Sequence, residues 1–154
     1  MKVQDVMKRG VVTCASSQSL GHAARIMWEQ DCGSVPVVDE AGRVVAMLTD
    51  RDICMATFHD DQTPWCIGVL RAASTNVRVV RETDTLEVAE AVMRNQQVHR
   101  VPVVDAANRP VGILSTTDLV REARAGGEGA AGLDPESVVR VLGAVCAPRR
   151  HSPP

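Results

Sequence analysis

Ser34-Val35-Pro36-Val37-Val38-Asp39 is the stretch of sequence that decides the fold, because the chain contains it twice. The second copy, Arg100-Val101-Pro102-Val103-Val104-Asp105, lies 66 residues further on. At this constant offset, residues 3–54 align with residues 69–120 without a gap, and 16 of the 52 aligned positions are identical. Ordinary composition would give roughly 4 identities by chance, so we infer an internal duplication.

Each repeat has the pattern of one supersecondary unit. An apolar helical stripe comes first, made by Leu20, Ala23, Ala24 and Met27 and by Leu86, Ala89, Val92 and Met93. Ser17 and Asp84 are expected to cap these helices. Two β-branched runs then flank turn residues and predict hairpins, 35–38 with 44–48 and 101–104 with 111–114. A further helix is expected from Asp52 and Asp118 onward, and an earlier short strand near 11–13 and 77–79.

The two units are expected to share one core, because about 55 residues alone would make a marginal domain. We predict a module over residues 1–123, with repeats at about 3–58 and 69–123 joined by a surface connector at 60–64. A Gly-rich linker is expected at 124–133. Residues 134–154 are predicted to hold a C-terminal helix and a disordered tail, with Asp134-Pro135 at the helix start and an apolar face of Val138, Val139, Leu142 and Val145.

The composition excludes several classes of protein. The net charge of −2 offers no broad basic surface for nucleic acid, and 2% aromatic residues offer few stacking platforms. No segment approaches the roughly 20 apolar residues that span a bilayer, and no secretory signal is visible, so we expect a cytoplasmic protein with no membrane partner. The five cysteines make no zinc spacing, and we interpret them as reduced, mostly buried thiols rather than a redox switch.

The duplicated pattern resembles the cystathionine-β-synthase (CBS) domain family. The resemblance rests on the Pro-Val-Val-Asp segment, the turn after it, and an apolar strand that leads to Ser/Thr-x-x-Asp. In that strand, the first repeat has Ala46 where the family usually has glycine, whereas the second repeat has Gly112. The resemblance covers about 3–123. It implies an α+β fold in which two β-α-β-β-α repeats pack as a pseudo-two-fold pair, often called a Bateman module. It also implies homodimers through helical faces and the sensing of adenosyl ligands, chiefly AMP, ADP or ATP.

Thr49-x-x-Asp52 and Ser115-x-x-Asp118 are the first candidates for ligand chemistry. A carboxylate can accept both hydrogens of a ribose diol, and a hydroxyl beside the free amides of a helix N-terminus can hold a phosphate. The same pattern is also that of an N-terminal capping arrangement. Its recurrence after the same strand in both repeats favours ligand binding, and the two roles are compatible.

The family resemblance places a stronger ligand site in the second repeat. It implies that His99 and Arg100 approach the phosphates, with Ser115, Thr117 and Asp118 holding phosphate and ribose. An arginine fork suits phosphate oxygens, although Arg100 could equally be a surface charge and His99 could make an ordinary hydrogen bond. By the same resemblance, the site is completed by Ile113 beside the base and by Val12 and Gly33 of the first repeat.

A weaker site is expected in the first repeat. Gly33 and Ser34 stand where the second repeat has His99 and Arg100, so the basic pair is missing. Arg51 could compensate, or it could form a surface salt bridge with Asp50 or Asp52. The other residues expected at this weaker site are Thr49, Asp52, Met47 and Arg78.

The sequence therefore predicts a non-catalytic regulatory module that binds an adenine nucleotide and signals to an unidentified effector protein. It requires no cofactor and no metal, and it is expected to be a homodimer whose interface uses the helix stripes beyond the core. The alternative is a scaffold or interaction module with no ligand. Catalysis by a Cys/His pair finds no recognisable spacing, and the absence of a P-loop argues against nucleotide hydrolysis.

Overall fold

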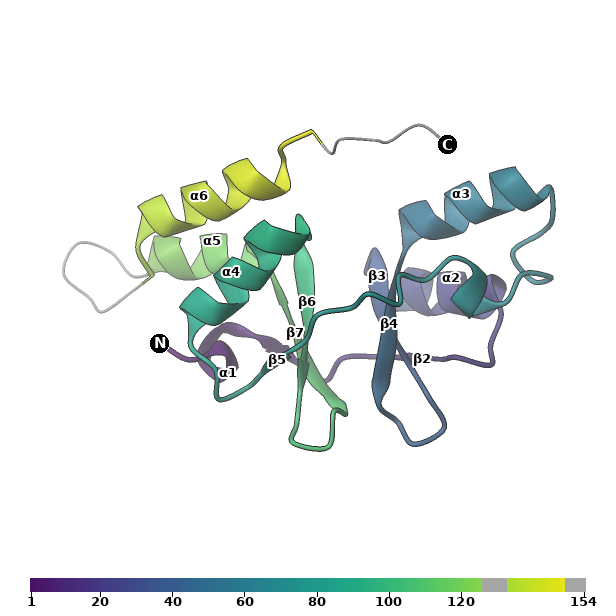
Figure 1. The fold of residues 1–154 in the computed structure, drawn as a ribbon, viewed down its shortest axis with the longest axis horizontal. Helices are drawn as coiled ribbons and strands as arrows, with labels where there is room; N and C mark the ends of the chain where they lie inside the picture. The colour runs from purple at the N-terminus through teal and green to yellow at the C-terminus, as the bar shows by residue number, and fades with distance from the viewer. Residues whose placement is uncertain (126–132, 149–154) are drawn as a thin grey trace.

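The computed structural model describes residues 1–125 and 133–148, and Figure 1 shows two sheets side by side with helices packed against them. The predicted mixed α+β fold is confirmed. One sheet has the strand order β2-β3-β4 and the other β1-β7-β6-β5. In chain order, the strands are β1 (Lys8–Arg9), β2 (Cys14–Ala15), β3 (Ser34–Val38), β4 (Val44–Thr49), β5 (Val80–Arg81), β6 (Arg100–Val104) and β7 (Pro110–Ser115). The helices are α1 (Val3–Val6), α2 (Leu20–Glu29), α3 (Asp50–Asp60), η1 (Val69–Arg71), α4 (Leu86–Gln96), α5 (Thr116–Ala125) and α6 (Pro135–Val145).

The strand ladders repeat between the two halves of the chain. The hairpins β3–β4 and β6–β7 are antiparallel, and each has a register shift near its turn, at Val37/Val38 and Val103/Val104. The short strands β2 and β5 lie parallel to β3 and β6. Each element of the first repeat therefore recurs in the second at the offset that the sequence predicts.

Three sequence predictions about element ends are wrong by a few residues. The short strands lie at Cys14–Ala15 and Val80–Arg81, not at 11–13 and 77–79. Helices α3 and α5 begin at Asp50 and Thr116, two residues before the predicted aspartates, because the cap is the residue that ends the preceding strand. The residues at the N-cap positions of α2 and α4 are Ser19 and Thr85, not the expected Ser17 and Asp84. Asp84 instead accepts from the Arg81 N–H at 2.8 Å and closes a turn.

The N-terminal segment of each repeat packs on the other repeat. Strand β1 pairs with β7, and Val3 and Met7 are buried in the core of the second repeat. Reciprocally, Ile67 and Val69 are buried in the core of the first repeat. Figure 1 shows the two crossing segments, one from β1 to β2 and one from η1 to β5, running between the halves. The predicted intertwining is thus an exchange of N-terminal segments.

The apolar stripes of the helices are buried in the two cores. Leu20, Ala23, Leu86, Ala89 and their neighbours are almost fully buried, and so are Met27 and Met93. The expectation that these residues extend beyond the core to form a dimer interface is therefore wrong. Any interface on these helices must use their outward-facing residues.

Helix α6 packs on α4 and α5 of the second repeat (Figure 1). Asp134 caps it as predicted, accepting from the Glu136 and Ser137 N–H groups at 3.1 Å, with Pro135 in the first turn. Of the predicted apolar face, Val138 and Val145 are buried and Leu142 packs partly buried against the core, but Val139 is 66% exposed and Val141, which was not predicted, is buried. Most of the predicted linker at 124–133 lies outside the described residues. Residues 149–154, at the end of the predicted tail, also lie outside them.

Two other sequence expectations concern the cysteines and possible membrane spans. Only Cys14 among the described cysteines is buried, Cys32 is half-buried, and the rest are exposed (Cys54, Cys66 and Cys146), so the expectation of mostly buried thiols is wrong. All five thiols are free of disulfides. Among the described residues, we find no helix with the length and hydropathy needed to cross a bilayer.

Candidate functional site

The Ser115–Asp118 pair forms a reciprocal cap at the start of α5. Asp118 Oδ2 accepts from the Ser115 N–H at 2.9 Å and from its hydroxyl at 2.5 Å, and the Asp118 N–H donates to Ser115 Oγ at 3.2 Å. The second carboxylate oxygen, Oδ1, accepts from Arg121 Nη1 at 3.1 Å. This arrangement fixes a buried carboxylate at a helix N-terminus, directly after strand β7.

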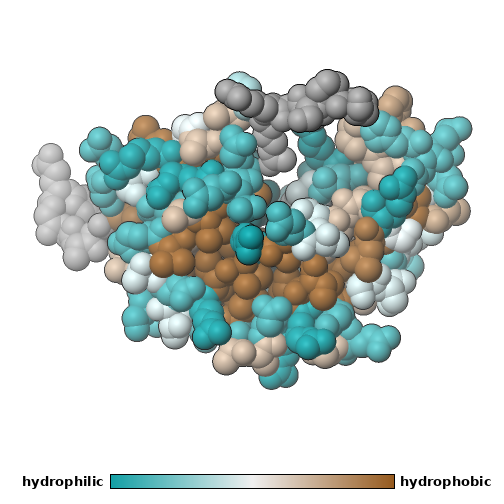
Figure 2. All heavy atoms as spheres, in the orientation of Figure 1, coloured by the Kyte–Doolittle hydropathy of each residue, from teal (hydrophilic) through white to brown (hydrophobic). Residues whose placement is uncertain are grey.

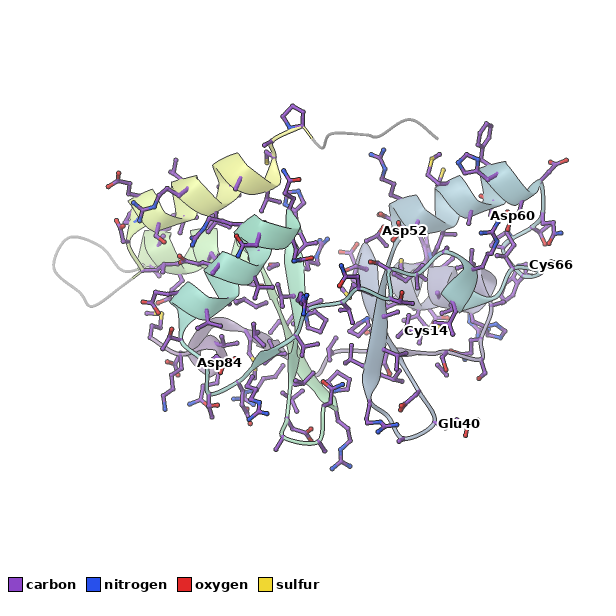
Figure 3. The ribbon with its side chains drawn as sticks, viewed as in Figure 1. Cys14, Glu40, Asp52, Asp60, Cys66 and Asp84 are labelled. Carbon is purple, nitrogen blue, oxygen red and sulfur yellow. The ribbon has the colours of Figure 1, made fainter. Side chains whose placement is uncertain are left out.

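The Thr49–Asp52 pair repeats this geometry at the start of α3, where Figure 3 labels Asp52. Asp52 Oδ2 accepts from the Thr49 N–H at 2.9 Å and from its hydroxyl at 2.7 Å, and the Asp52 N–H donates to Thr49 Oγ1 at 3.2 Å. The capping role expected from the sequence is confirmed in both repeats. Because it leaves carboxylate lone pairs unused, it does not conflict with ligand binding.

The two carboxylates differ in the acceptor sites that remain. A carboxylate offers about four lone-pair sites, and Asp118 uses three of them, two for Ser115 and one for Arg121. In the described part of the chain, Asp52 Oδ1 has no recorded hydrogen bond. A ribose diol could therefore bind Asp52 directly, whereas at Asp118 it would replace the exposed Arg121 side chain.

The second repeat brings its predicted residues together at the ends of β6 and β7. Arg100 is directly opposite Ser115 in the β6–β7 ladder. The His99 carbonyl accepts from the Thr116 N–H at 2.9 Å, and His99 Nδ1 lies 3.5 Å from Thr116 Oγ1. His99, Arg100 and Thr117 are exposed, so a basic and polar rim surrounds the buried Asp118.

The first repeat places Gly33 and Ser34 in the same positions. Ser34 pairs with Thr49 in the β3–β4 ladder, and the Asp50 N–H donates to the Gly33 carbonyl at 3.1 Å. A Cβ added to Gly33 would meet the carboxylate oxygen Oδ2 of Asp50 at 3.0 Å, so a larger side chain there would require the Asp50 side chain to shift slightly.

The remaining predicted residues take equivalent places in the two repeats. Ile113 on β7 and Met47 on β4 are half-buried, and each is paired with a proline on the neighbouring antiparallel strand. Val12 and Arg78 lie on the two crossing segments. Val12 packs against the first-repeat core and Arg78 is exposed. For Arg51, no ion pair with Asp50 or Asp52 is present among the described residues, and its backbone N–H donates to Asp50 Oδ1 at 2.7 Å.

The described structure shows no contact by which the first repeat closes the Asp118 site. Gly33 lies beside Asp50, and Val12 packs against the first-repeat core, so both of these residues contact their own repeat. Gly33 also lines a pocket of about 500 Å³ between α2 and α3, all of whose lining residues belong to the first repeat. A second pocket, of about 370 Å³, lies near Arg81, Asp84 and Asn108, beside the β6–β7 turn.

Sequence reasoning missed two side chains around the predicted sites. Arg121 could have been found, because it stands three residues after Asp118 on a helix, where oppositely charged side chains meet. Thr116 is buried beside His99. Ser34, which the sequence identifies as the counterpart of Arg100, is buried with no hydrogen bond to its hydroxyl in the described structure.

In residues 1–125 and 133–148, no three His, Cys, Asp or Glu side chains gather around a common point where they could hold a metal ion.

The titratable groups with shifted pKa values lie away from the two capping pairs, Ser115–Asp118 and Thr49–Asp52. The pKa values of the turn carboxylates Asp39 and Asp105 are lowered, chiefly by backbone hydrogen bonds from Arg43 and Arg109. Burial raises the pKa of the Cys14 thiol.

Two β-α-β-β-α units that exchange their N-terminal segments define a class of paired-repeat α+β modules. The chain belongs to the CBS domain family, whose sequence model matches residues 3–58 and 69–125. This confirms the family predicted from the duplicated motif. A curated relative, the CBS domain-containing protein YhcV of Bacillus subtilis, is 37% identical over 120 residues, which is 76% of this chain and 81% of YhcV.

Solved structures of CBS domain pairs are similar to this fold. The CBS domain pair of protein MJ0100, in complex with 5′-methylthioadenosine and S-adenosyl-L-methionine, is 28% identical with a TM-score of 0.70; the match covers 79% of this chain and 94% of that one. CBSX2 in complex with AMP is 26% identical with a TM-score of 0.69, covering 80% of this chain and 96% of that one. Family members of this fold therefore bind adenosyl ligands.

Proposed function

We propose that this chain is a non-catalytic regulatory module that binds an adenine nucleotide, AMP, ADP or ATP, in clefts between the repeats. The observation that carries the proposal is the polar cluster at the start of α5. There, the buried Asp118 carboxylate, the Ser115 hydroxyl and the exposed Arg100 come together at the N-terminus of α5. The AMP complex of CBSX2 and the adenosyl complex of MJ0100 support the ligand class.

Each group has a distinct role in this proposal. Asp118 accepts the ribose hydroxyls, with Arg121 moving aside. The α5 N-terminus, Ser115 and Thr117 favour a phosphate, because the positive end of the helix dipole attracts negative charge and the two hydroxyls can donate hydrogen bonds. Arg100 and His99 extend the positive rim toward the phosphates. Ile113 flanks the base, and Val12 with Gly33 closes the pocket from the first repeat.

The first-repeat cleft is proposed as the weaker site, with Thr49, Asp52, Arg51, Met47 and Arg78. It keeps the ribose acceptor but lacks the basic pair. The two clefts would then differ chiefly in phosphate affinity, and the Asp118 cleft would prefer nucleotides over nucleosides.

The proposal is of a sensor and not an enzyme. One serine–histidine contact exists, Ser19 Oγ to His22 Nδ1 at 2.9 Å, but it lies within the first turn of α2. No carboxylate orients this histidine in the part of the chain that the structure describes, so the contact lacks the third member of a hydrolytic site. The proposal further includes a cytoplasmic location, a homodimer and an effector protein that responds to the bound ligand.

Isothermal titration against a ligand panel tests this function. The panel comprises AMP, ADP, ATP, S-adenosylmethionine and 5′-methylthioadenosine, with adenosine to isolate the phosphate and GMP as the matched base control. We expect saturable binding of at least one adenine nucleotide, and none of GMP. Binding of no adenosyl compound by a folded chain would contradict the sensor function and favour the interaction module.

A further inference from the structure

The start of α3 carries a carboxylate where the start of α5 carries a hydroxyl. Asp50 is the first residue of α3, and its counterpart at the 66-residue offset is Thr116, the first residue of α5. Thr116 Oγ1 lies 3.5 Å from His99 Nδ1, and Asp50 Oδ2 lies 3.0 Å from the place that a Cβ on Gly33 would take. Because Gly33 is the counterpart of His99, the first repeat sets a carboxylate against the position at which the second has an imidazole.

The Asp50 carboxylate is held in this place by the backbone around it. The Asp50 N–H donates to the Gly33 carbonyl at 3.1 Å, and Oδ1 accepts from the Arg51 N–H at 2.7 Å. Both carboxylate oxygens lie within 3.9 Å of the Cβ position of residue 33. The Arg51 side chain is exposed, and in the described part of the chain no direct ion pair with it compensates the charge of Asp50.

Neither the strand end nor the nearby pocket supplies a positive charge beside Asp50. Ser34 stands where the second repeat has Arg100, and its buried hydroxyl has no hydrogen bond in the described structure. Gly33 and Asp50 also line the pocket of about 500 Å³ between α2 and α3. Its charged lining residues are Asp31 and Asp50, and no Lys, Arg or His among the described residues lines it. A phosphate near the α3 start would therefore meet a charge of its own sign, which repels it.

The second repeat shows that the fold does not require a carboxylate at this position. Thr116 begins α5 without a charge, and the strand ladder and the capping pair are the same in both repeats. An acidic residue in the first turn stabilises a helix through its dipole, but Asp52 and Asp118 already supply one to α3 and α5. The Asp50 carboxylate is thus free to act in recognition.

We propose that Asp50 sets the charge preference of the first-repeat cleft. This cleft accepts an adenosyl ligand whose 5′ substituent is uncharged or cationic, and it disfavours a 5′-phosphate. Asp52 binds the ribose diol, and Asp50 meets the group at C5′. The inference rests on the proposed function and names a separate ligand class for one of its two clefts. The module then responds to two kinds of adenosyl compound at once, an anionic one at Asp118 and a neutral or cationic one at Asp52.

Three ligands that differ only at C5′ isolate this charge preference. They are AMP, adenosine and 5′-amino-5′-deoxyadenosine, whose amine is protonated at neutral pH. Isothermal titration into Asp118→Ala, which weakens the other cleft, should give the tightest binding for the amine and the weakest for AMP. The parent saturated with AMP should still bind the amine, at one molecule per chain. Added salt should reduce the preference, because it screens exposed charges.

Asp50→Thr, made in the Asp118→Ala chain, imports the second repeat's own residue and tests the assignment to Asp50. It should tighten AMP binding and weaken binding of the amine by roughly two- to fivefold each, which is the range of exposed charge pairs. Asp50→Asn removes the charge with little change of shape and should act in the same way. Glu40→Ala is the matched control, because it removes a carboxylate from the exposed β3–β4 turn, far from Asp52 (Figure 3), and imports the counterpart residue Ala106. It should leave the affinities for all three ligands unchanged.

Three results would overturn the inference and leave the sensor function standing. They are tighter binding of AMP than of adenosine to Asp118→Ala, no binding of any of the three ligands to a folded Asp118→Ala chain, and equal effects of Asp50→Thr and Glu40→Ala. In each case the parent would still bind AMP. A folded parent that binds none of the three ligands would overturn the sensor function as well, so the two failures are distinguishable.

Discussion

Asp39 and Asp105 close the hairpin turns of their repeats with matching hydrogen bonds. Asp105 Oδ1 accepts from the Ala107 N–H at 2.8 Å and from the Arg109 N–H at 2.9 Å, and Asp39 does the same with Ala41 and Arg43 at 2.9 Å. These bonds are stronger when the carboxylate is ionised, and they therefore lower the pKa of both groups in the folded chain. Each turn is therefore coupled to pH.

Asp105→Asn should destabilise the fold near neutral pH and progressively less in acid. The folded pKa lies below the unfolded value of about 3.9, so the ionised carboxylate stabilises the native state above that pH. This contribution is lost as the pH falls through the folded pKa. Urea midpoints of parent and variant should differ at neutral pH and converge in acid, once the pH has fallen through the folded pKa. A difference that is equal at both pH values would show that the charge is not responsible.

The candidate site was predictable at the level of residues where the chemistry is local. The hydroxyl-x-x-Asp pattern fixes a helix start, so both capping pairs could be read from the sequence. The ion pair of Arg121 with Asp118 was also predictable, because the two residues stand three positions apart on a helix. Features that depend on neighbouring strands were not predictable, and the buried Ser34 hydroxyl, which has no hydrogen bond in the described structure, is one of them.

At the scale of elements, α6 behaves as part of the second repeat. Its existence and start were predictable, because Asp134-Pro135 is a strong helix N-terminus. Its buried face was not, because Val138, Val139, Val141 and Leu142 offer two overlapping apolar stripes. Packing against α4 and α5 selects the stripe that contains Val141 and leaves Val139 in solvent.

Val141→Ala should lower the free energy of unfolding by about 2 kcal/mol, because two buried methyl groups at about 0.8 kcal/mol each are lost and a small cavity remains. Val139→Ala changes the same residue type at an exposed position and should change stability by less than about 0.5 kcal/mol. Chemical denaturation of both variants measures the difference. Equal effects would mean that α6 does not dock as described.

The whole molecule is held together by the exchange of N-terminal segments. The core of the second repeat contains Val3 and Met7, and that of the first contains Ile67 and Val69. Figure 2 shows hydrophobic atoms gathered across the middle of the molecule, over the strands of both sheets. Duplication alone predicted one core shared by the repeats, and this is wrong, because the buried residues form two clusters, each completed by a segment that arrives from the other half. It could not show which half each segment joins, because two aligned copies contain no information about their mutual packing.

The exchange also accompanies two capping pairs in equivalent positions, one in each repeat. In the proposed function, a ligand at one of them would contact a helix start and a strand end, with the segment that crosses from the other repeat closing the site. Binding there would then bias the relative placement of the repeats, which is how we propose that the module signals. The central claim is that the Asp118 site is the principal one.

Isothermal titration of Asp118→Ala and Asp52→Ala with AMP and ATP tests that claim most directly. Both variants lose the same capping bonds, so each controls for the effect of the other on helix stability. Hydrogen bonds to a charged acceptor contribute about 1.5–3 kcal/mol, so Asp118→Ala should weaken binding roughly 10- to 100-fold and Asp52→Ala by less. A folded Asp118→Ala variant that binds every adenosyl ligand as tightly as the parent would contradict the account.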